Sequence, residues 1–298
     1  MRWMAFWMAF VWAFGLFASE RYVESLYSPY GQSFEISSVI YQEKSDWWDL
    51  MIFENPRFGK VLVMDGTVQM TEADEPIYHE MMAHVPLLAH PDPKSVLIVG
   101  GGEGGVLREV LRHSTVEKVV LVEIDAKVID LSKTYFPSLS QGAFEDPRVT
   151  VVIQDACIYI KETSEPFDVI LCDSTDPIGP GKVLFTEEFY GHCKARLNPD
   201  GIFVNQNGVP FLQPEEIALT MKNRAPHFAF VTYYMVPVPT YIGGAMALGW
   251  ASDKKYRPAL GKLNERLKKV KGKMKYYTPH VHKAAFALPQ FVLDVSKK

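Results

Sequence analysis

The segment "VLIVGGGEGGVLREVL", residues 96–111, constrains the fold of this chain more than any other. An apolar run leads into a cluster of glycines, and the residues after the cluster have helical spacing. This order is typical of the strand, tight turn and helix that open a nucleotide-binding βαβ unit. Gly100, Gly102 and Gly105 also match the GxGxxG pattern, which alone is a weak indicator of function. Glu103 is unusual there, because a carboxylate repels the phosphates that such loops commonly bind.

Strand-type and helix-type patterns alternate along the middle of the chain. Apolar runs that predict strands lie at residues 95–99, 118–124, 149–154, 167–174 and 201–206. Helical patterns separate them, and such alternation indicates a parallel sheet with helices on both faces. Two later β-type runs, at residues 230–238 and 245–252, are expected to extend the sheet with antiparallel pairing. We therefore predict an α/β fold with a Rossmann-like, methyltransferase-type sheet.

Three units are predicted along the chain. They are an apolar segment at residues 1–20, a small antiparallel β domain at residues 21–72 and the Rossmann-like domain at residues 73–298. The small domain contains an Asp65-Gly66 pair, which is typical of a hairpin turn. The helix expected to begin near residue 75 leads from the small domain into the larger one.

The N-terminal segment is apolar from Trp3 to Ala18 behind one positive charge at Arg2. It is long enough for the core of a signal peptide but short for a membrane span, and it lacks a good cleavage site. Three interpretations stay open: a membrane or interface anchor, a weak export signal, or residues upstream of the true translation start. We favour the last, because the remainder has the pattern of a complete soluble protein. Membrane contact is expected only if this segment is present and retained.

Charge and cysteine content argue against several classes of function. The formal net charge is −4, so the chain has no overall attraction for nucleic acid. The basic run at residues 262–275 lacks interleaved aromatic residues, and we expect no nucleic-acid partner. The three cysteines do not have metal-ligand spacing, which predicts reduced thiols, a cytoplasmic protein and no metal site.

Acidic residues follow four successive predicted strands. Glu103 follows the first strand, Glu123 ends the second, Asp155 follows the third, and Asp173 with Asp176 follows the fourth. In an open parallel sheet, ligands bind beyond the carboxyl ends of the strands. A single acid in such a loop is usually a cap or turn residue, but four in succession indicate a site that attracts a cation.

The spacing of Glu123 fits both a dinucleotide and an adenosyl ligand, and the charge of Glu103 argues against the pyrophosphate of a dinucleotide. Glu123 lies about twenty residues after the glycines, where an acid accepts hydrogen bonds from ribose hydroxyls. Asp155 would then be placed for the adenine amino group, with the backbone of Ala156 beside it. An adenosyl sulfonium carries no phosphate, so Glu103 would be tolerated. Glu103 would also repel the carboxylate of intact S-adenosylmethionine, which favours the decarboxylated compound.

The chain resembles the spermidine synthases, or polyamine aminopropyltransferases, and the bacterial members most closely. The resemblance runs from about residue 30 to the C-terminus and is carried by "DGTVQMTEADEPIYHEM", "VLIVGGGEGGVLREVL", "VEID", "DPRV", "FDVILCDSTDPIGPGKVLF", "VPTYIGG" and "AAFALPQ". It implies that the Rossmann-like domain transfers the aminopropyl group of decarboxylated S-adenosylmethionine to putrescine. The products would be spermidine and methylthioadenosine. The resemblance also implies a homodimer or homotetramer, no metal and no bound cofactor.

The resemblance assigns roles to eleven residues of this chain. The residues implied to bind the aminopropyl donor are Glu103, Glu123, Asp155, Ala156 and Pro180. The residues implied to act in catalysis are Asp173 as proton acceptor, with Tyr78 and Tyr241 assisting. The residues implied to line the diamine channel are Gln69, His79, Asp173, Asp176 and Tyr241. Crowding by Glu103 and Asp176 is expected to raise the pKa of Asp173.

Three positions depart from the usual family pattern. Glu103 stands where the family usually has Asp, and Ala156 stands where Gly is common. Trp48 stands where a Gln usually contacts the nucleoside. An indole can stack on a ligand but cannot donate an amide hydrogen bond.

Two other functions use the same sequence features. An S-adenosylmethionine-dependent diamine N-methyltransferase would have the same sheet and nucleoside-binding acids. A catalytically silent polyamine-binding protein would share the acidic crevice. Within the aminopropyltransferases the acceptor stays open among putrescine, cadaverine, agmatine and spermidine, because the length of the pocket decides the choice.

Overall fold

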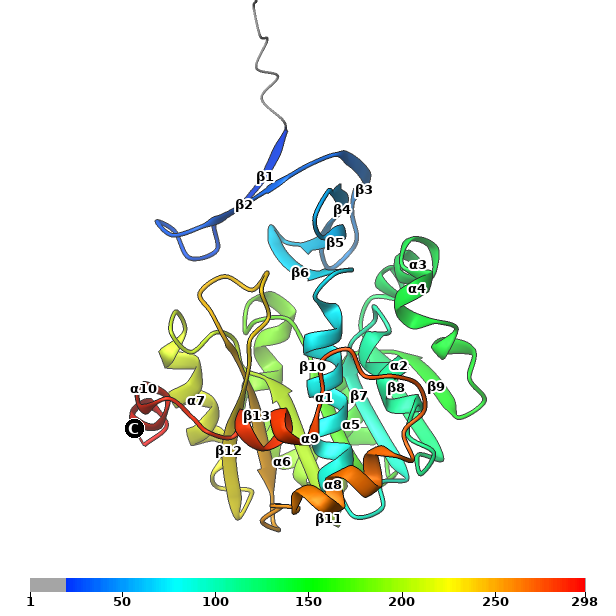
Figure 1. Ribbon diagram of the computed structural model, residues 1–298, viewed down its shortest axis with the longest axis vertical. Helices are drawn as coiled ribbons and strands as arrows, with labels where there is room; N and C mark the ends of the chain where they lie inside the picture. Colours follow the sequence, from blue (N-terminus) through cyan, green and yellow to red (C-terminus); the bar gives the residue numbers. More distant parts are fainter. Residues whose placement is uncertain (1–19, 298) are drawn as a thin grey trace, which may run out of the picture.

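The computed structural model of this chain describes residues 20–297 (Figure 1). The apolar N-terminal segment lies outside the described residues, apart from Glu20. No helix within the described range is long and apolar enough to cross a membrane.

The N-terminal part forms two small antiparallel sheets, at the top of Figure 1. The strands are β1 (Arg21–Glu24), β2 (Gln32–Glu35), β3 (Ser38–Lys44), β4 (Asp49–Asn55), β5 (Gly59–Met64) and β6 (Thr67–Thr71). β1 pairs with β2, and β3 to β6 form a four-stranded meander. Asp65 and Gly66 connect β5 to β6 with φ angles of 48° and 77°, which confirms the predicted hairpin turn.

The second part of the chain forms a seven-stranded sheet in the order β12-β13-β11-β10-β7-β8-β9. Its strands are β7 (Ser95–Gly100), β8 (Lys118–Glu123), β9 (Val149–Ile153), β10 (Phe167–Asp173), β11 (Leu197–Gln206), β12 (Phe230–Val236) and β13 (Met246–Ser252). The first five of these pair in parallel, and β13 and β12 add antiparallel pairs at one edge. The predicted fold class is confirmed. β11 begins four residues earlier than the sequence pattern indicated.

Helices cover both faces of this sheet (Figure 1). The α-helices are α1 (Glu75–Ala89), α2 (Gly105–Leu111), α3 (Ala126–Tyr135), α4 (Pro137–Ser140), α5 (Ala156–Glu162), α6 (Glu187–Arg196), α7 (Pro214–Arg224), α8 (Leu260–Leu267), α9 (Pro279–Ala285) and α10 (Gln290–Val295). The described residues also contain two 3₁₀ helices, η1 (Ala143–Glu145) and η2 (Gly179–Phe185). α1, α2, α8 and α9 pack on one face, and α5 and α6 pack on the other. Alternate strand residues supply the apolar surface on each face.

The strand order creates a crevice between β7 and β10, because the strands that follow β7 are added first on one side of it and then on the other. β8 and β9 extend from β7 to one side, and β10 and β11 extend to the other. Such a switch point lies at the carboxyl ends of the strands and is where ligands bind in open α/β sheets. Gly100 allows β7 and β10 to meet closely there, because a Cβ at this position would lie 2.2 Å from the carbonyl oxygen of Asp173.

The small sheets lie over this crevice (Figure 1), and the four-stranded one makes an apolar contact with α3. Trp48, Leu50 and Ile52 from the β4 region pack with Val128 and Leu131 of α3. Burial of each large apolar side chain contributes about 1.5–3 kcal/mol. The contact therefore holds the two parts of the chain together around the crevice.

Candidate active site

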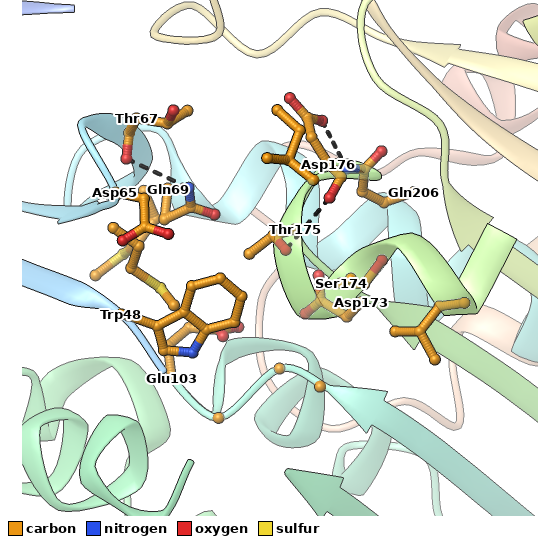
Figure 2. Close-up of a pocket in the computed structure, with 18 of the residues that line it drawn as sticks. Trp48, Asp65, Thr67, Gln69, Glu103, Asp173, Ser174, Thr175, Asp176 and Gln206 are labelled. Carbon is orange, nitrogen blue, oxygen red and sulfur yellow. Dashed lines mark hydrogen bonds between the residues drawn. The ribbon is translucent and has the colours of Figure 1, made fainter. Parts of the chain in front are cut away.

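A cavity of about 320 Å³ lies between the small sheets and the carboxyl ends of the parallel strands. It is lined by every site residue that the sequence predicted, namely Gln69, Tyr78, His79, Glu103, Glu123, Asp155, Ala156, Asp173, Asp176, Pro180 and Tyr241. Figure 2 shows several of these side chains pointing into the cavity from opposite walls. The structure thus brings together residues that are up to 172 positions apart in the sequence.

Seven carboxylates line the cavity, whereas the described residues contribute no Lys or Arg to its walls. The acidic residues are Glu24, Asp65, Glu103, Glu123, Asp155, Asp173 and Asp176. Carboxylates brought this close in a low-dielectric site repel one another, so the free cavity favours a cationic ligand strongly. No group of three or more side chains suited to hold a metal ion occurs within residues 20–297.

Asp173 stands at the end of β10 and lines the cavity. Its Oδ1 accepts a hydrogen bond of 2.6 Å from the Tyr78 hydroxyl, while its Oδ2 is buried and has no partner among the residues that the structure describes. Burial, followed by the charge of Glu103, raises the pKa of Asp173 to about 8. The predicted direction is confirmed, but burial is the largest cause and the contributing acids are Glu103 and Glu123, so the expected contribution of Asp176 stays a prediction. A buried carboxylate with one free oxygen and a raised pKa is suited to accept a proton.

His79 links Glu103 to a second pair of charges outside the cavity. Its Nε2 lies 3.2 Å from Glu103 Oε1, and its Nδ1 lies 2.5 Å from Glu75 Oε2. Glu75 also accepts hydrogen bonds of 2.9 Å and 3.3 Å from Arg108. Burial alone lowers the pKa of an imidazole, but the two carboxylates outweigh it and raise the pKa of His79 to about 10. His79 is therefore a cation at neutral pH.

Gly105 makes room for this imidazolium. It is the first residue of α2, and a Cβ at this position would lie 2.2 Å from the His79 ring. The third glycine of the predicted motif thus allows α1 and α2 to pack closely enough for the ion pair. A phosphate ligand is not needed to explain its presence.

Glu123 and Asp155, the two acids predicted to bind the nucleoside, also line the cavity. Glu123, the last residue of β8, accepts hydrogen bonds from the backbone N–H groups of Gly102 and Asp125. Burial, reinforced by the charge of Glu103, raises the pKa of Glu123 to about 7. Asp155 precedes α5 and caps it, because Oδ1 accepts a 2.7 Å hydrogen bond from Cys157 N–H. It caps the helix and lines the cavity at the same time.

Five segments of the chain meet in the part of the cavity around Asp176 and Tyr241. Asp176 Oδ1 accepts a 3.0 Å hydrogen bond from Gln206 Nε2, and burial raises the pKa of Asp176. The Tyr241 hydroxyl donates a 2.6 Å hydrogen bond to the Gln69 carbonyl. The Tyr241 ring meets Tyr78 edge to face at 6.0 Å. Polar and aromatic side chains thus line this part of the cavity together with Asp173.

Sequence reasoning missed four residues of this region. Gln206 is the last residue of β11, so the position of polar residues at strand ends would have indicated it if amides were considered together with acids. Glu24 comes from the β1 hairpin, and nothing near it in the sequence indicates a site. Glu75 lies one helical turn before His79, a spacing that permits an ion pair. Arg108 carries no sequence signal for its pairing with Glu75.

Comparisons with known proteins agree with this geometry. Residues 75–259 match the spermine/spermidine synthase domain, and residues 22–72 match the spermidine synthase tetramerisation domain. The chain therefore belongs to the spermine/spermidine synthase family.

Similar proteins cover nearly the whole chain. The polyamine aminopropyltransferase of a Ruegeria species is 52% identical over 90% of this chain and 95% of its own length. Polyamine aminopropyltransferase 1 of Pseudomonas aeruginosa is 49% identical, covering 93% and 98%. The crystal structure of a spermidine synthase in complex with the transition-state analogue AdoDATO has a TM-score of 0.88 at 40% identity, covering 93% and 95%. The spermidine synthase of Thermotoga maritima has a TM-score of 0.87 at 39% identity, covering 94% and 95%.

Proposed function

We propose that this protein is a polyamine aminopropyltransferase, a spermidine synthase. It transfers the aminopropyl group of decarboxylated S-adenosylmethionine to putrescine and releases spermidine and methylthioadenosine. The observation that carries this proposal is a cavity with seven carboxylates and no Lys or Arg among its described lining residues. The donor carries a sulfonium and an ammonium, and the acceptor carries two amines, so both substrates bring positive charge to a cavity whose described lining has one cation, the His79 imidazolium. The family membership supports the same reaction.

The reaction is an in-line displacement at carbon. The neutral amine of putrescine attacks the aminopropyl carbon next to the sulfonium, a C–N bond forms, and the C–S bond breaks with its electron pair moving to sulfur. An alkyl amine with a pKa like that of Lys, about 10.4, costs roughly 4.6 kcal/mol to deprotonate at neutral pH. Asp173 orients the nitrogen, accepts its proton and passes it to solvent, with Tyr78 and Tyr241 assisting. Alignment of two bound substrates contributes several kcal/mol more.

Glu103, Glu123, Asp155, Ala156 and Pro180 bind the donor in this proposal. Glu103 pairs with the ammonium of the donor, Glu123 accepts hydrogen bonds from the ribose hydroxyls, and Asp155 accepts one from the adenine amino group. Gln69, His79, Asp176 and Tyr241 line the diamine channel with Asp173. Because His79 is enclosed between Glu75 and Glu103, it acts on the substrates mainly through Glu103.

The direct test supplies the purified protein with putrescine and either decarboxylated or intact S-adenosylmethionine. We expect spermidine and methylthioadenosine from the decarboxylated donor alone, identified by mass spectrometry. A methylated diamine from the intact donor would instead identify an N-methyltransferase. Absence of product with putrescine, cadaverine, agmatine and spermidine, together with binding of a polyamine, would identify a catalytically silent binding protein.

Glu103 provides a test of donor selection. Replacement by Ala removes the charge that repels the substrate carboxylate, so Glu103→Ala should bind intact S-adenosylmethionine more tightly and the decarboxylated donor more weakly. Glu117→Ala is the matched control, because Glu117 is an exposed acid that pairs with Lys94 outside the cavity. Unchanged affinity of Glu103→Ala for both donors would exclude Glu103 as the selecting residue.

The assembly and the location of the enzyme are part of the same proposal. The chain forms a homodimer or homotetramer through its small domain at residues 21–72, supported by the match to the tetramerisation domain. The domain at residues 73–298 carries the catalytic residues. The enzyme works in the cytoplasm, where its three free thiols stay reduced. Light scattering gives the mass of the assembly, and cell fractionation tests the location.

A further inference from the structure

A second cavity, of about 450 Å³, lies at the edge of the seven-stranded sheet, where β12 and β13 meet α9. It shares no lining residue with the candidate active site. Gln206 of the active site pairs with Leu248 in β13, whereas Phe230 of the second cavity pairs with Ser252 at the other end of that strand. The two cavities therefore lie toward opposite ends of the sheet. A volume of this size is typical of sites that bind small molecules.

The charge of the second cavity is opposite to that of the active site. Among the described residues, Lys255, Arg257 and Lys283 line it, and no Asp or Glu does. All three cations are exposed, and none forms an ion pair with a carboxylate within residues 20–297. The adjacent Lys254, by contrast, is paired with Asp200. Three cations without partners around one cavity attract an anionic ligand.

His282 adds a buried polar group to the wall of this cavity. It is 3% exposed, and its Nδ1 lies 2.9 Å from the hydroxyl of Tyr277, which is also buried. No other described group bonds to this hydroxyl, so the hydroxyl donates to Nδ1 and the ring proton lies on Nε2. Burial, followed by the charge of Lys283, lowers the pKa of His282 to about 4, so the ring is neutral at pH 7. Nε2–H has no acceptor among the described residues and is not fully enclosed by them, which leaves a donor for a ligand.

Aromatic side chains form the apolar part of the wall. The ring centroid of Trp250 lies 5.7 Å from that of Phe286 and 6.1 Å from that of Tyr256, both edge to face. Phe230 of the edge strand β12 is 39% exposed. Phe286 belongs to the segment "AAFALPQ", one of the motifs that carry the resemblance to the family, and no residue of that segment lines the active site. The active site therefore does not account for this motif.

We propose that the second cavity binds a small organic anion whose acidic group is carried on an aromatic ring. Lys255, Arg257 and Lys283 neutralise the acidic group, which also accepts the hydrogen bond of His282 Nε2–H. The ring of the ligand packs against the aromatic wall. Phosphate monoesters and carboxylates share this chemistry. The inference does not rest on the proposed function, because the two cavities have no lining residue in common.

The test measures binding of four probes to the full-length protein by calorimetry. They are phenyl phosphate, benzoate, inorganic phosphate and phenol. We expect saturable binding of at least one aromatic acid, and affinities about tenfold lower or less for inorganic phosphate and phenol, because each lacks one half of the ligand. Tighter binding of either acid supports the inference and identifies the acidic group. Lack of saturable binding of both aromatic acids, or equal affinity for phenyl phosphate and inorganic phosphate, would overturn it.

Variants of exposed residues locate the bound acid. Lys283→Gln should weaken binding of the aromatic acid by about tenfold, because it removes a charged partner. Lys262→Gln is the matched control, since Lys262 is an exposed lysine of α8 outside both cavities. Phe230→Ser should weaken binding of the aromatic acid and leave that of inorganic phosphate unchanged. Equal affinities of folded Lys283→Gln and Lys262→Gln would overturn the inference, and thermal unfolding checks that each variant is folded.

The imidazole of His282 gives a readout that a diffuse attraction between charges would not move. In proton–nitrogen NMR spectra at pH 7, its Nε2 resonance should shift on titration with the aromatic acid and stay in place with phenol. The resonance is assigned from its loss in His282→Gln. A resonance that stays in place when the protein is saturated with the acid would overturn the inference.

Discussion

Two neighbouring regions of this protein bury acidic side chains, but the pKa values of these acids are shifted in opposite directions. Between α1 and α2, Glu75 and Glu109 are paired with His79, His84, Arg108 and Arg112 in one continuous network. At the ends of β8 and β10, Glu123 and Asp173 have no Lys or Arg partner among the described residues that line the cavity. Burial raises the pKa of an acid in both regions, but pairing reverses the shift between the helices. The pKa of Glu75 is lowered, whereas that of Asp173 is raised to about 8.

This difference in pairing distinguishes acids that stabilise the fold from acids that are positioned to bind a cationic ligand. A buried pair of charges contributes to stability when both partners are present, and loss of one partner is costly. An unpaired buried acid costs stability in the free protein and is satisfied only when a cation binds. Glu103 lies at the boundary, because it approaches His79 on one side and faces the cavity on the other.

Removal of the carboxylate at the end of β10 should have the largest effect. Asp173→Asn keeps the shape of the side chain but cannot take up the proton of the attacking amine. We expect turnover to fall by a factor of about 100 or more while methylthioadenosine still binds. Steady-state kinetics and calorimetry measure the two quantities. Near-normal turnover would remove Asp173 from its proposed role.

Removal of one charge from the helix network should instead affect stability. Glu75→Gln leaves His79 and Arg108 without their shared carboxylate, and we expect a loss of about 3 kcal/mol or more in the free energy of unfolding. Urea unfolding at pH 7 measures this loss. The control is Glu165→Gln, which breaks the exposed 2.6 Å pair with Lys118 and should cost less than about 1 kcal/mol. Equal losses would contradict the proposed distinction between the regions.

Asp173→Asn should also change how stability depends on pH. The folded-state pKa of Asp173, about 8, lies above its ordinary value of 3.8. The stability that this group contributes is therefore complete below about pH 3.8 and is lost as the pH rises through about 8. The Asn variant lacks this loss, so at pH 9 it should be more stable than the wild type by at least about 1 kcal/mol, the value of one pKa unit. A variant that is less stable at every pH would show that Asp173 is satisfied in the free protein.

The smallest effect concerns the pH dependence of the reaction. Activity requires the ionised form of Asp173, so kcat/KM for the donor should rise with pH and begin to level near pH 8, the pKa in the free enzyme. Bound sulfonium and ammonium groups stabilise the ionised carboxylate of Asp173 and so lower its pKa. The rise of kcat with pH should therefore level about one pH unit below the rise of kcat/KM. A kcat limb at the higher pH would mean that the bound substrates do not stabilise the carboxylate of Asp173.

Much of the fold and part of the site could be predicted because their signals are local. The glycine cluster at residues 100–105, the alternation of strands and helices, and the acids at four strand ends each depend on neighbouring residues. The parallel arrangement then forces those acids to one edge. The sequence features therefore predicted the fold class, and the motifs shared with the family predicted where Asp173 and Glu123 would lie.

The tertiary structure alone decided which charges are paired and which stay free. Glu75 and Arg108 are 33 residues apart, and their contact depends on how closely α2 approaches α1 at Gly105. Glu24 and Trp48 reach the cavity only because the small sheets fold over the crevice. A carboxylate or an indole has the same sequence signal whether it is paired or not, because its charge state and bonding depend on burial and on partners brought from distant parts of the chain.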